Sequence, residues 1–291
     1  MRSEYASEIR SIFDSDIAAE VMLGGGDVGC SRQIRLADGN TVFVKSYAEK
    51  DIAKAEAAGL KSLKATNTVN VPPVLYVSDY LLVLPWIEGH SSSEDALYEL
   101  GKALAGLHKS PLEFEGFGYS ENNFIGASPQ ENMPMNGENS WAEFFGQKRL
   151  WFQGKRLENS PLLSAANRLK ILNLLEKLIW KLPELLQTQE SWPSLLHGDL
   201  WKGNYMIDTD GKAWLIDPAV YQGHREADIA MTTLFGGFST SFYQGYRSIW
   251  PLEDGYRDRE PIYQLYHILN HIGFFGEAYL SQALLILKKF V

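Results

Sequence analysis

Cysteine, long apolar runs and positive charge are all scarce in this 291-residue chain, and each scarcity excludes a class of protein. The single cysteine cannot form an intramolecular disulfide, and the N-terminal sequence lacks the apolar core of a signal peptide, so we expect a cytoplasmic protein. The longest nearly apolar stretch, Leu81 to Ile87, is far shorter than the roughly 20 residues of a membrane-spanning helix. We therefore expect no membrane partner.

The charge and composition limit the partners further. A net charge of -9 opposes attraction to nucleic acid, so any phosphate site must be built locally from backbone amides and a few cations. With 45% hydrophobic and 22% charged residues, the chain is typical of folded globular proteins. Its length allows two domains or lobes of roughly 150 residues each.

Strand patterns fill the first ninety residues and helical patterns follow, which predicts an α+β fold. Apolar alternation predicts strands on each side of Asp38-Gly39, and a helix is expected from about Lys50 to Lys64. We therefore predict two lobes, a β-rich N-lobe over residues 1–88 that binds nucleotide and a mainly α-helical C-lobe over residues 89–291 that binds the acceptor.

Two features stand out in the predicted C-lobe. Leucine and isoleucine recur at helical spacing between Leu97 and Leu107 and again between Leu172 and Leu182, which predicts amphipathic helices. Between them, Phe114 to Ser140 is dense in Gly, Asn, Pro and Ser, which predicts an irregular surface segment of the kind that shapes substrate sites.

The strongest signal runs from Leu195 to Ala219 and predicts a β-hairpin. Two apolar runs flank Asp210-Gly211, a dipeptide that suits a two-residue turn. If the turn is centred between these two residues, Asn204 lies opposite Asp217, about 5 Å away across the strands. An amide oxygen and a carboxylate are hard ligands that suit Mg²⁺ with nucleotide phosphates, so we predict these two residues as metal ligands.

Asp199 precedes Asn204 by five residues, which is the spacing of the kinase catalytic loop. In that loop the aspartate accepts the proton of the attacking hydroxyl, so we predict Asp199 as the catalytic residue. A surface hairpin with solvated polar ends is the alternative for any one of these residues, but their joint occurrence favours a site. We interpret His197 as a buried anchor of the loop and not as a proton-transfer group.

A glycine cluster and a Lys-Glu pair predict the nucleotide site. Glycines let the backbone approach phosphates, although this cluster lacks the Walker sequence. Lys45 ends a strand pattern on the same face as Phe43, and Glu56 falls inside an apolar helical stripe, where a carboxylate needs a partner. A pair of this kind orients a lysine toward nucleotide phosphates in kinase-like enzymes. The glycines of the predicted cradle are Gly24, Gly25, Gly26 and Gly29.

Together these residues resemble the fructosamine kinase, or ketosamine 3-kinase, family, which is related to aminoglycoside and choline kinases. The resemblance covers nearly the whole chain, with matching segments at Val42–Lys45, Glu56–Leu63, Gly106–Lys109, Phe114–Gly126, His197–Asn204 and Ile216–Phe238. The tryptophan after His-Gly-Asp-Leu and the segment Gly-His-Arg-Glu-Ala-Asp favour this family over its relatives. The resemblance implies a protein-kinase-like fold that uses ATP and Mg²⁺.

The resemblance also implies a reaction and further site residues. The γ-phosphate of ATP would pass to the 3-hydroxyl of a small-molecule ketosamine or glycated amine, and the phosphorylated adduct would then decompose. The linker that meets adenine would be Leu84, Pro85, Trp86, Ile87 and Glu88. The acceptor side would be formed by Trp201, Tyr221, His224, Arg225 and Glu226. Alternatively, Trp201 packs between the lobes and Arg225 pairs with Asp228.

Other functions stay open on sequence alone. An aminoglycoside- or choline-type phosphotransferase would be distinguished by its acceptor. A non-catalytic nucleotide-binding module is disfavoured because the set of kinase-like residues is complete. An interaction protein that uses the amphipathic segment Ala283–Phe290 is disfavoured because such a pattern suits a lobe core. A protein kinase is disfavoured because Asp217 is followed by proline and not by Phe-Gly.

Overall fold

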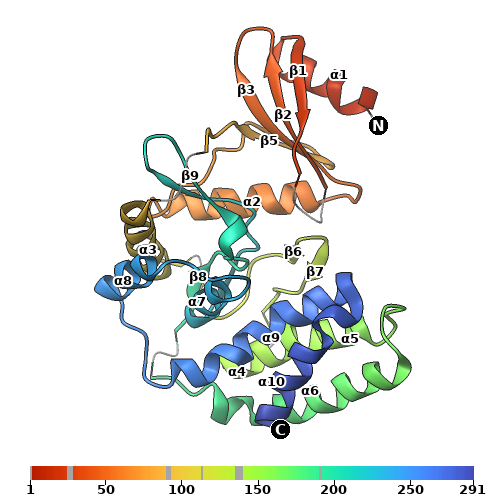
Figure 1. The fold of residues 1–291 in the computed structure, drawn as a ribbon, viewed down its shortest axis with the longest axis vertical. Helices are drawn as coiled ribbons and strands as arrows, with labels where there is room; N and C mark the ends of the chain where they lie inside the picture. The colour runs from red at the N-terminus through yellow and green to blue at the C-terminus, as the bar shows by residue number, and fades with distance from the viewer. Residues whose placement is uncertain (1, 25–28, 90–92, 113, 135–139, 190–191) are drawn as a thin grey trace.

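The chain folds into two lobes, with the N-lobe above the C-lobe in Figure 1. This computed structural model describes residues 2–24, 29–89, 93–112, 114–134, 140–189 and 192–291. The predicted α+β, two-lobed fold is confirmed. The predicted cradle residues Gly25 and Gly26 lie outside the described residues.

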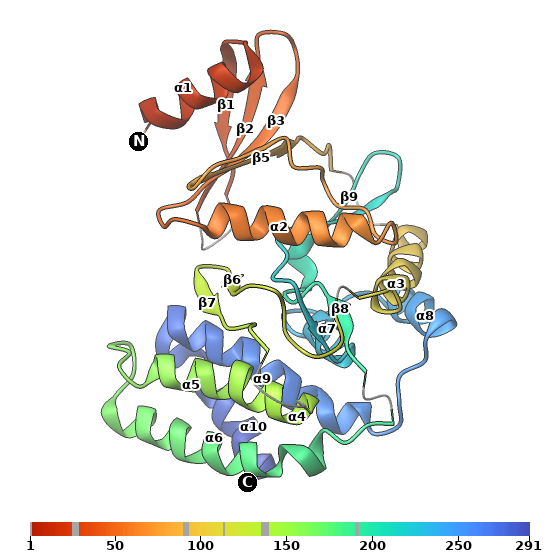
Figure 2. The ribbon, with the colours of Figure 1, turned by 180° about the vertical axis from the view of Figure 1, so that it is seen from behind.

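An antiparallel sheet with helices on both faces builds the N-lobe, and within the described residues its strand order is β1-β2-β3-β5-β4. Tyr5 and Ile9 of the first helix pack against Ile34 and Val44 on one face, while the second helix lies on the side toward the C-lobe (Figures 1 and 2). The elements are α1 (Arg2–Phe13), β1 (Ile17–Met22), β2 (Cys30–Leu36), β3 (Thr41–Ser46), α2 (Ile52–Ala65), β4 (Tyr76–Val77) and β5 (Leu81–Pro85).

The C-lobe is mainly helical, as predicted. Its first part contains α3 (Glu94–His108), β6 (Asn123–Ile125), β7 (Ser128–Gln130), α4 (Trp141–Phe144), a π-helical stretch (Phe145–Trp151), α5 (Phe152–Leu157) and α6 (Ala165–Leu185). Its second part contains β8 (Ser194–Leu196), β9 (Tyr205–Ile207), β10 (Ala213–Leu215), β11 (Tyr221–Gly223), α7 (Glu226–Thr233), α8 (Thr240–Ile249), α9 (Tyr256–Phe275) and α10 (Leu280–Phe290).

The segment from Phe114 to Ser140 differs from the irregular surface segment that the sequence predicts. It contains the β6–β7 hairpin, and the side chains of Asn123 and Gln130 are buried. Gln130 donates to the Asn123 amide oxygen at 2.8 Å, and Asn123 donates to the Val220 carbonyl at 2.8 Å. The polar residues therefore fasten the hairpin to the chain before β11, because each amide finds a buried partner.

The C-terminal helix belongs to the core of the C-lobe. Ala283 and Leu287 of α10 are fully buried in the same apolar cluster as α6 and α9. The interpretation of Ala283–Phe290 as lobe core agrees with this placement. Throughout the part of the chain that the structure describes, no helix is both long and apolar enough to cross a bilayer.

Candidate active site

The chain between β8 and β11 frames the candidate site. These two strands pair antiparallel, and the β9–β10 hairpin is inserted between them in sequence. The loop from His197 to Asn204 directly follows β8. Gly198 in this loop has φ 82°, and a Cβ atom there would lie 2.0 Å from the Ala219 carbonyl oxygen. The turn into the loop therefore requires glycine.

The hairpin is present, but its register is one residue away from the prediction. The Ile216 amide donates to the Asn204 carbonyl at 3.0 Å, so Asn204 lies opposite Ile216 and not opposite Asp217. The turn spans residues 209–211 instead of two residues, with Gly211 at φ 79°. Asp217 then leaves the hairpin in a left-handed conformation, with φ 53°.

The predicted contact between Lys45 and Glu56 is formed, and Asp217 joins it. The Lys45 ammonium nitrogen lies 3.0 Å from Glu56 Oε2 and 3.0 Å from Asp217 Oδ1. The Tyr47 hydroxyl also donates to Glu56. Burial alone would lower the pKa of Lys45, but the two carboxylates outweigh it and hold that pKa well above its ordinary value. Lys45 is therefore a cation where the lobes meet.

A glycine brings the two lobes together at this cluster. Gly59 of α2 faces the chain after β10, and a Cβ atom there would lie 3.2 Å from the Pro218 ring. A larger residue would push α2 away from the segment that carries Asp217. Glu56 lies one turn earlier on the same helix, so this close approach lets one lysine contact carboxylates from both lobes.

Asp199 is held beside Asn204. The amide nitrogen of Asn204 donates to Asp199 Oδ2 at 3.2 Å and to the Asp199 carbonyl at 2.8 Å. Burial, together with the negative charge of Asp217, raises the pKa of Asp199 to about 7. A carboxyl group with a pKa near the working pH suits the transfer of a hydroxyl proton.

Asn204 and Asp217 fit a divalent cation chemically. Because the Asn204 amide nitrogen is engaged with Asp199, the amide oxygen is the atom left for a metal. Burial would raise the pKa of Asp217, but the Lys45 ammonium outweighs it, so this pKa lies below its ordinary value. An ionised carboxylate and an amide oxygen are the hard ligands that such an ion takes beside nucleotide phosphates.

His197 is the buried loop anchor that the sequence suggested. Its Nδ1 accepts from the Asp199 amide at 3.3 Å, and its Nε2 donates to the Ile216 carbonyl at 2.9 Å. One neutral imidazole therefore links the backbone of Asp199 to the strand that leads to Asp217.

Asp228 also holds this loop, a role that sequence reasoning missed. From α7 its carboxylate accepts the backbone amides of His197 at 2.7 Å and Gly198 at 2.9 Å. It also contacts His108 Nε2 at 3.2 Å. Asp228 is the last residue of the Gly-His-Arg-Glu-Ala-Asp segment, and this was the only hint in the sequence. Its partners lie about 30 residues or more away along the chain, so no local pattern pointed to them.

Four residues predicted for the acceptor side are instead buried inside the C-lobe. Tyr221 packs under the Arg149 guanidinium, whose carbon lies 3.9 Å from the ring centroid. Glu226 pairs with Arg259 at 2.7 Å. At this depth, these side chains have no open surface for a sugar. The residues placed this way are Tyr221, His224, Arg225 and Glu226, all at most 2% exposed.

The remaining predicted residues lie near the surface, at the end of β5 or in the linker that follows it. Trp201 is 37% exposed and makes an edge contact with Phe235, with ring centroids 6.3 Å apart. Trp86 donates its indole N–H to Glu88 at 2.8 Å in the segment after β5. Gly29 has φ 96°, and a Cβ atom there would lie 2.8 Å from the Ser46 carbonyl oxygen, so only glycine suits this end of the cradle. A Cβ atom at Gly24 would meet no other atom within 4 Å. Leu84 and Pro85 are the last two residues of β5, with Leu84 buried in the core, and Ile87 lies in the chain that follows.

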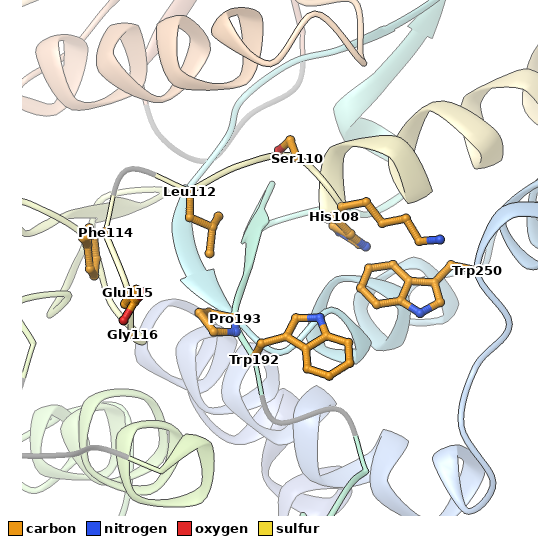
Figure 3. Close-up of a pocket in the computed structure, with 10 residues that line it drawn as sticks. His108, Ser110, Leu112, Phe114, Glu115, Gly116, Trp192, Pro193 and Trp250 are labelled. Atoms are coloured by element: carbon orange, nitrogen blue, oxygen red, sulfur yellow. The ribbon is translucent and has the colours of Figure 1, made fainter.

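A separate cavity of about 980 Å³ lies in the C-lobe beside the start of β8. Figure 3 shows Trp192 and Pro193 on one side of it, with Trp250 and the end of α3 on another. None of the predicted site residues lines this cavity. This cavity is therefore separate from the candidate site at Asp199.

We expect the buried histidines to lower the free energy of unfolding as the pH falls from 7 to 5, whereas Asp199, whose folded pKa is about 7, acts in the opposite direction. Burial lowers the pKa of His108, His197 and His267, the last to about 3, whereas unfolded histidine titrates near 6.5. Below pH 6.5 these histidines bind protons in the unfolded chain and stay neutral in the folded chain. Their contribution to the free energy of unfolding is therefore fully present above pH 6.5 and is lost below it. His267, whose folded pKa is about 3, should by itself cost about 2 kcal/mol at pH 5.

Urea denaturation at the two pH values checks this expectation. His267→Asn should lose about 2 kcal/mol less than the wild-type protein between pH 7 and pH 5, because it removes one such group. Parallel losses in the two proteins would show that His267 is not held neutral by burial.

Comparison with known proteins agrees with the kinase-like placement of Lys45, Asp199 and Asp217. The sequence signature of the fructosamine kinase family matches residues 1–291. This chain belongs to the fructosamine kinase family. A “probable ketoamine kinase” of Synechocystis is 42% identical over 273 residues, which cover 90% of this chain and 87% of that protein. A chloroplastic protein-ribulosamine 3-kinase of Arabidopsis thaliana is 35% identical over 277 residues, covering 92% of this chain and 81% of that protein.

Solved structures agree with this family assignment. A “putative fructosamine-3-kinase” from Haemophilus somnus superposes with a TM-score of 0.85 at 28% identity, covering 100% of this chain and 98% of that chain. Aminoglycoside phosphotransferase APH(4)-Ia has a TM-score of 0.66 at 14% identity, with both chains covered completely, which shows the kinase-like fold alone. As a fructosamine kinase family member, the protein is an ATP-dependent phosphotransferase that acts on a hydroxyl group.

Proposed function

We propose that this protein phosphorylates the 3-hydroxyl of a ketosamine, a ribulosamine- or fructosamine-type adduct, and so starts the release of the sugar from its amine. The observation that carries the proposal is the joint placement of Lys45, paired with Glu56 and Asp217, and of Asp199 beside Asn204. The names of the Synechocystis and Arabidopsis relatives support a ketoamine acceptor.

Each group has a role in an in-line transfer. Lys45 and the backbone amides of the glycine cradle would contact the phosphates. Asn204 and Asp217 would hold Mg²⁺, which supplies positive charge that neutralises the phosphate oxygens. The acceptor oxygen forms a bond to the γ-phosphorus while the bond to the bridging oxygen of ADP breaks, and the hydroxyl proton passes to Asp199.

The binding surfaces are proposed from the family resemblance and from the exposure of Trp201. The backbone of Leu84 to Glu88, which leaves β5 between the lobes, would meet adenine. Trp201 follows Asp199 by two residues and exposes 37% of its surface, so its ring is available to stack on the sugar or the amine carrier.

Magnesium-dependent ATP consumption against a panel of acceptors tests the proposal. The panel contains ribulosamine, erythrulosamine, fructosamine, an aminoglycoside and choline, and product is identified by the position of the phosphate. We expect turnover with ketosamines only and phosphate on the 3-hydroxyl. Turnover with only the aminoglycoside or choline would show that the acceptor is not a ketosamine. No turnover with any acceptor would overturn the proposal.

A further inference from the structure

A histidine from α9 approaches Asp199 from the side that Asn204 leaves open. His267 Nδ1 lies 3.7 Å from Asp199 Oδ1, whereas Asn204 contacts Oδ2. His267 is 5% exposed, and among the described residues its Nδ1 has no hydrogen-bond partner although it is sealed from solvent. The catalytic loop therefore has a buried, unused polar atom directed at its central carboxylate.

An unpartnered buried nitrogen is costly, so its position calls for an explanation. Leaving such a group unsatisfied costs about 1–3 kcal/mol. Asp199 Oδ1 lies 3.7 Å from this nitrogen, and a neutral imidazole can carry its single proton on Nδ1 and donate toward that oxygen. A movement of about 0.7 Å would give an ordinary hydrogen bond, and catalytic hydrogen bonds often tighten when substrate binds.

The helix that carries His267 is firmly fixed. Arg259 of α9 pairs with the buried Glu226 at 2.7 Å, and the Tyr266 hydroxyl donates to Gln130 at 2.6 Å. Figure 1 shows α9 running below α7 and β8, so the helix supports the loop from underneath. A donor on such a helix can define the direction of a carboxylate more precisely than a surface side chain can.

We propose that His267 is a positioning residue, whose Nδ1–H donates to Asp199 Oδ1 in the substrate complex and fixes the carboxylate against the acceptor hydroxyl. The inference rests on the proposed function of Asp199. Asn204 would hold one oxygen and His267 the other, so the carboxylate could not rotate. The lone pairs that remain would face the acceptor.

Two substitutions of His267 separate this role from simple packing. His267→Asn keeps a short side chain with an N–H donor close to the position of Nδ1, whereas His267→Leu keeps apolar volume without a donor. We expect His267→Leu to lower kcat by about 10- to 100-fold, because small misplacement of a reacting group is costly, with an unchanged KM for ATP. His267→Asn should stay within about 3-fold of wild type.

A double variant distinguishes a positioning role of His267 from a purely structural one. In an Asp199→Asn background, adding His267→Leu should have no further effect on kcat, because residues that act as a unit are not additive. Equal losses in His267→Leu and His267→Asn, or multiplied losses in the double variant, would overturn the inference. Thermal unfolding and ADP binding of each variant confirm that the compared proteins are folded.

The outcome does not depend on the identity of the acceptor. The variants are compared on whichever hydroxyl compound the wild-type protein phosphorylates in the acceptor panel. Loss of the ketosamine assignment would therefore leave this comparison intact, and failure of the comparison would leave the ketosamine assignment intact.

Discussion

Replacement of Asp199 by asparagine should lower kcat by about 10²- to 10⁴-fold while the protein stays folded. The amide has nearly the same shape as the carboxylate, but it cannot accept the hydroxyl proton. The change also removes a negative charge beside Asp217, whose charge helps to raise the pKa of Asp199. Stability should therefore be kept or slightly increased, so lost turnover would report chemistry and not unfolding.

Steady-state kinetics with the preferred acceptor, together with ADP binding and thermal unfolding, measure this effect. Asp210→Asn is a matched control, because it removes one negative charge from the exposed turn of the nearby hairpin. The control should keep wild-type kcat. If Asp199→Asn stayed within about 10-fold of wild type, Asp199 would not be the proton acceptor.

Local patterns predicted much of the architecture. The strands around Asp38-Gly39, the helix that carries Glu56 and the hairpin around Asp210 all appear, because each depends on alternation or turn residues within one short segment. The contact between Lys45 and Glu56 also follows from two local faces, since each residue was placed by its own periodic pattern.

Two local features differ from the sequence prediction, the register of the hairpin and the presence of helix α1. The register of the hairpin shifted because Asp208 accepts the backbone amides of Asp210 and Lys212, which favours a longer turn than the Asp-Gly pair suggests. Helix α1 was missed because its few apolar residues, such as Tyr5 and Ile9, form only a short stripe.

In the candidate site, the contacts that the sequence did not predict join residues that are far apart along the chain. The family resemblance implied Tyr221 and Glu226 as acceptor contacts, but both are buried and contact Arg149 and Arg259, which are distant in sequence. His267 lies 68 positions after Asp199 on an ordinary amphipathic helix. No spacing rule connects the two, so only the three-dimensional structure brings this histidine to the carboxylate.

Replacement of Lys45 by methionine should reduce both turnover and stability. One ammonium stands between Glu56 and Asp217, at 3.0 Å from each, so its loss leaves two carboxylates facing each other where the lobes meet. Removing one partner of a buried ion pair costs about 3–5 kcal/mol. Loss of a preorganised cation at the phosphates should lower kcat by about 10²- to 10³-fold.

The double variant Lys45→Met with Glu56→Gln separates these two effects. Glutamine is neutral and can still accept the Tyr47 hydroxyl, which donates to Glu56 in the wild-type protein. Asp217, whose side chain is 39% exposed, could then be solvated, and no second buried carboxylate would face it. We therefore expect the double variant to recover most of the lost free energy of unfolding and none of the lost turnover.

Urea denaturation and steady-state kinetics on the single and double variants measure the two quantities independently. Lys54→Met is the control, because Lys54 on the same helix pairs with Asp79 at an exposed site, where such a pair contributes about 0–1 kcal/mol. Recovery of turnover in the double variant would show that Lys45 only balances buried charge. Recovery of stability alone would mean that the lysine is kept for the nucleotide phosphates, because the fold can be stabilised without it.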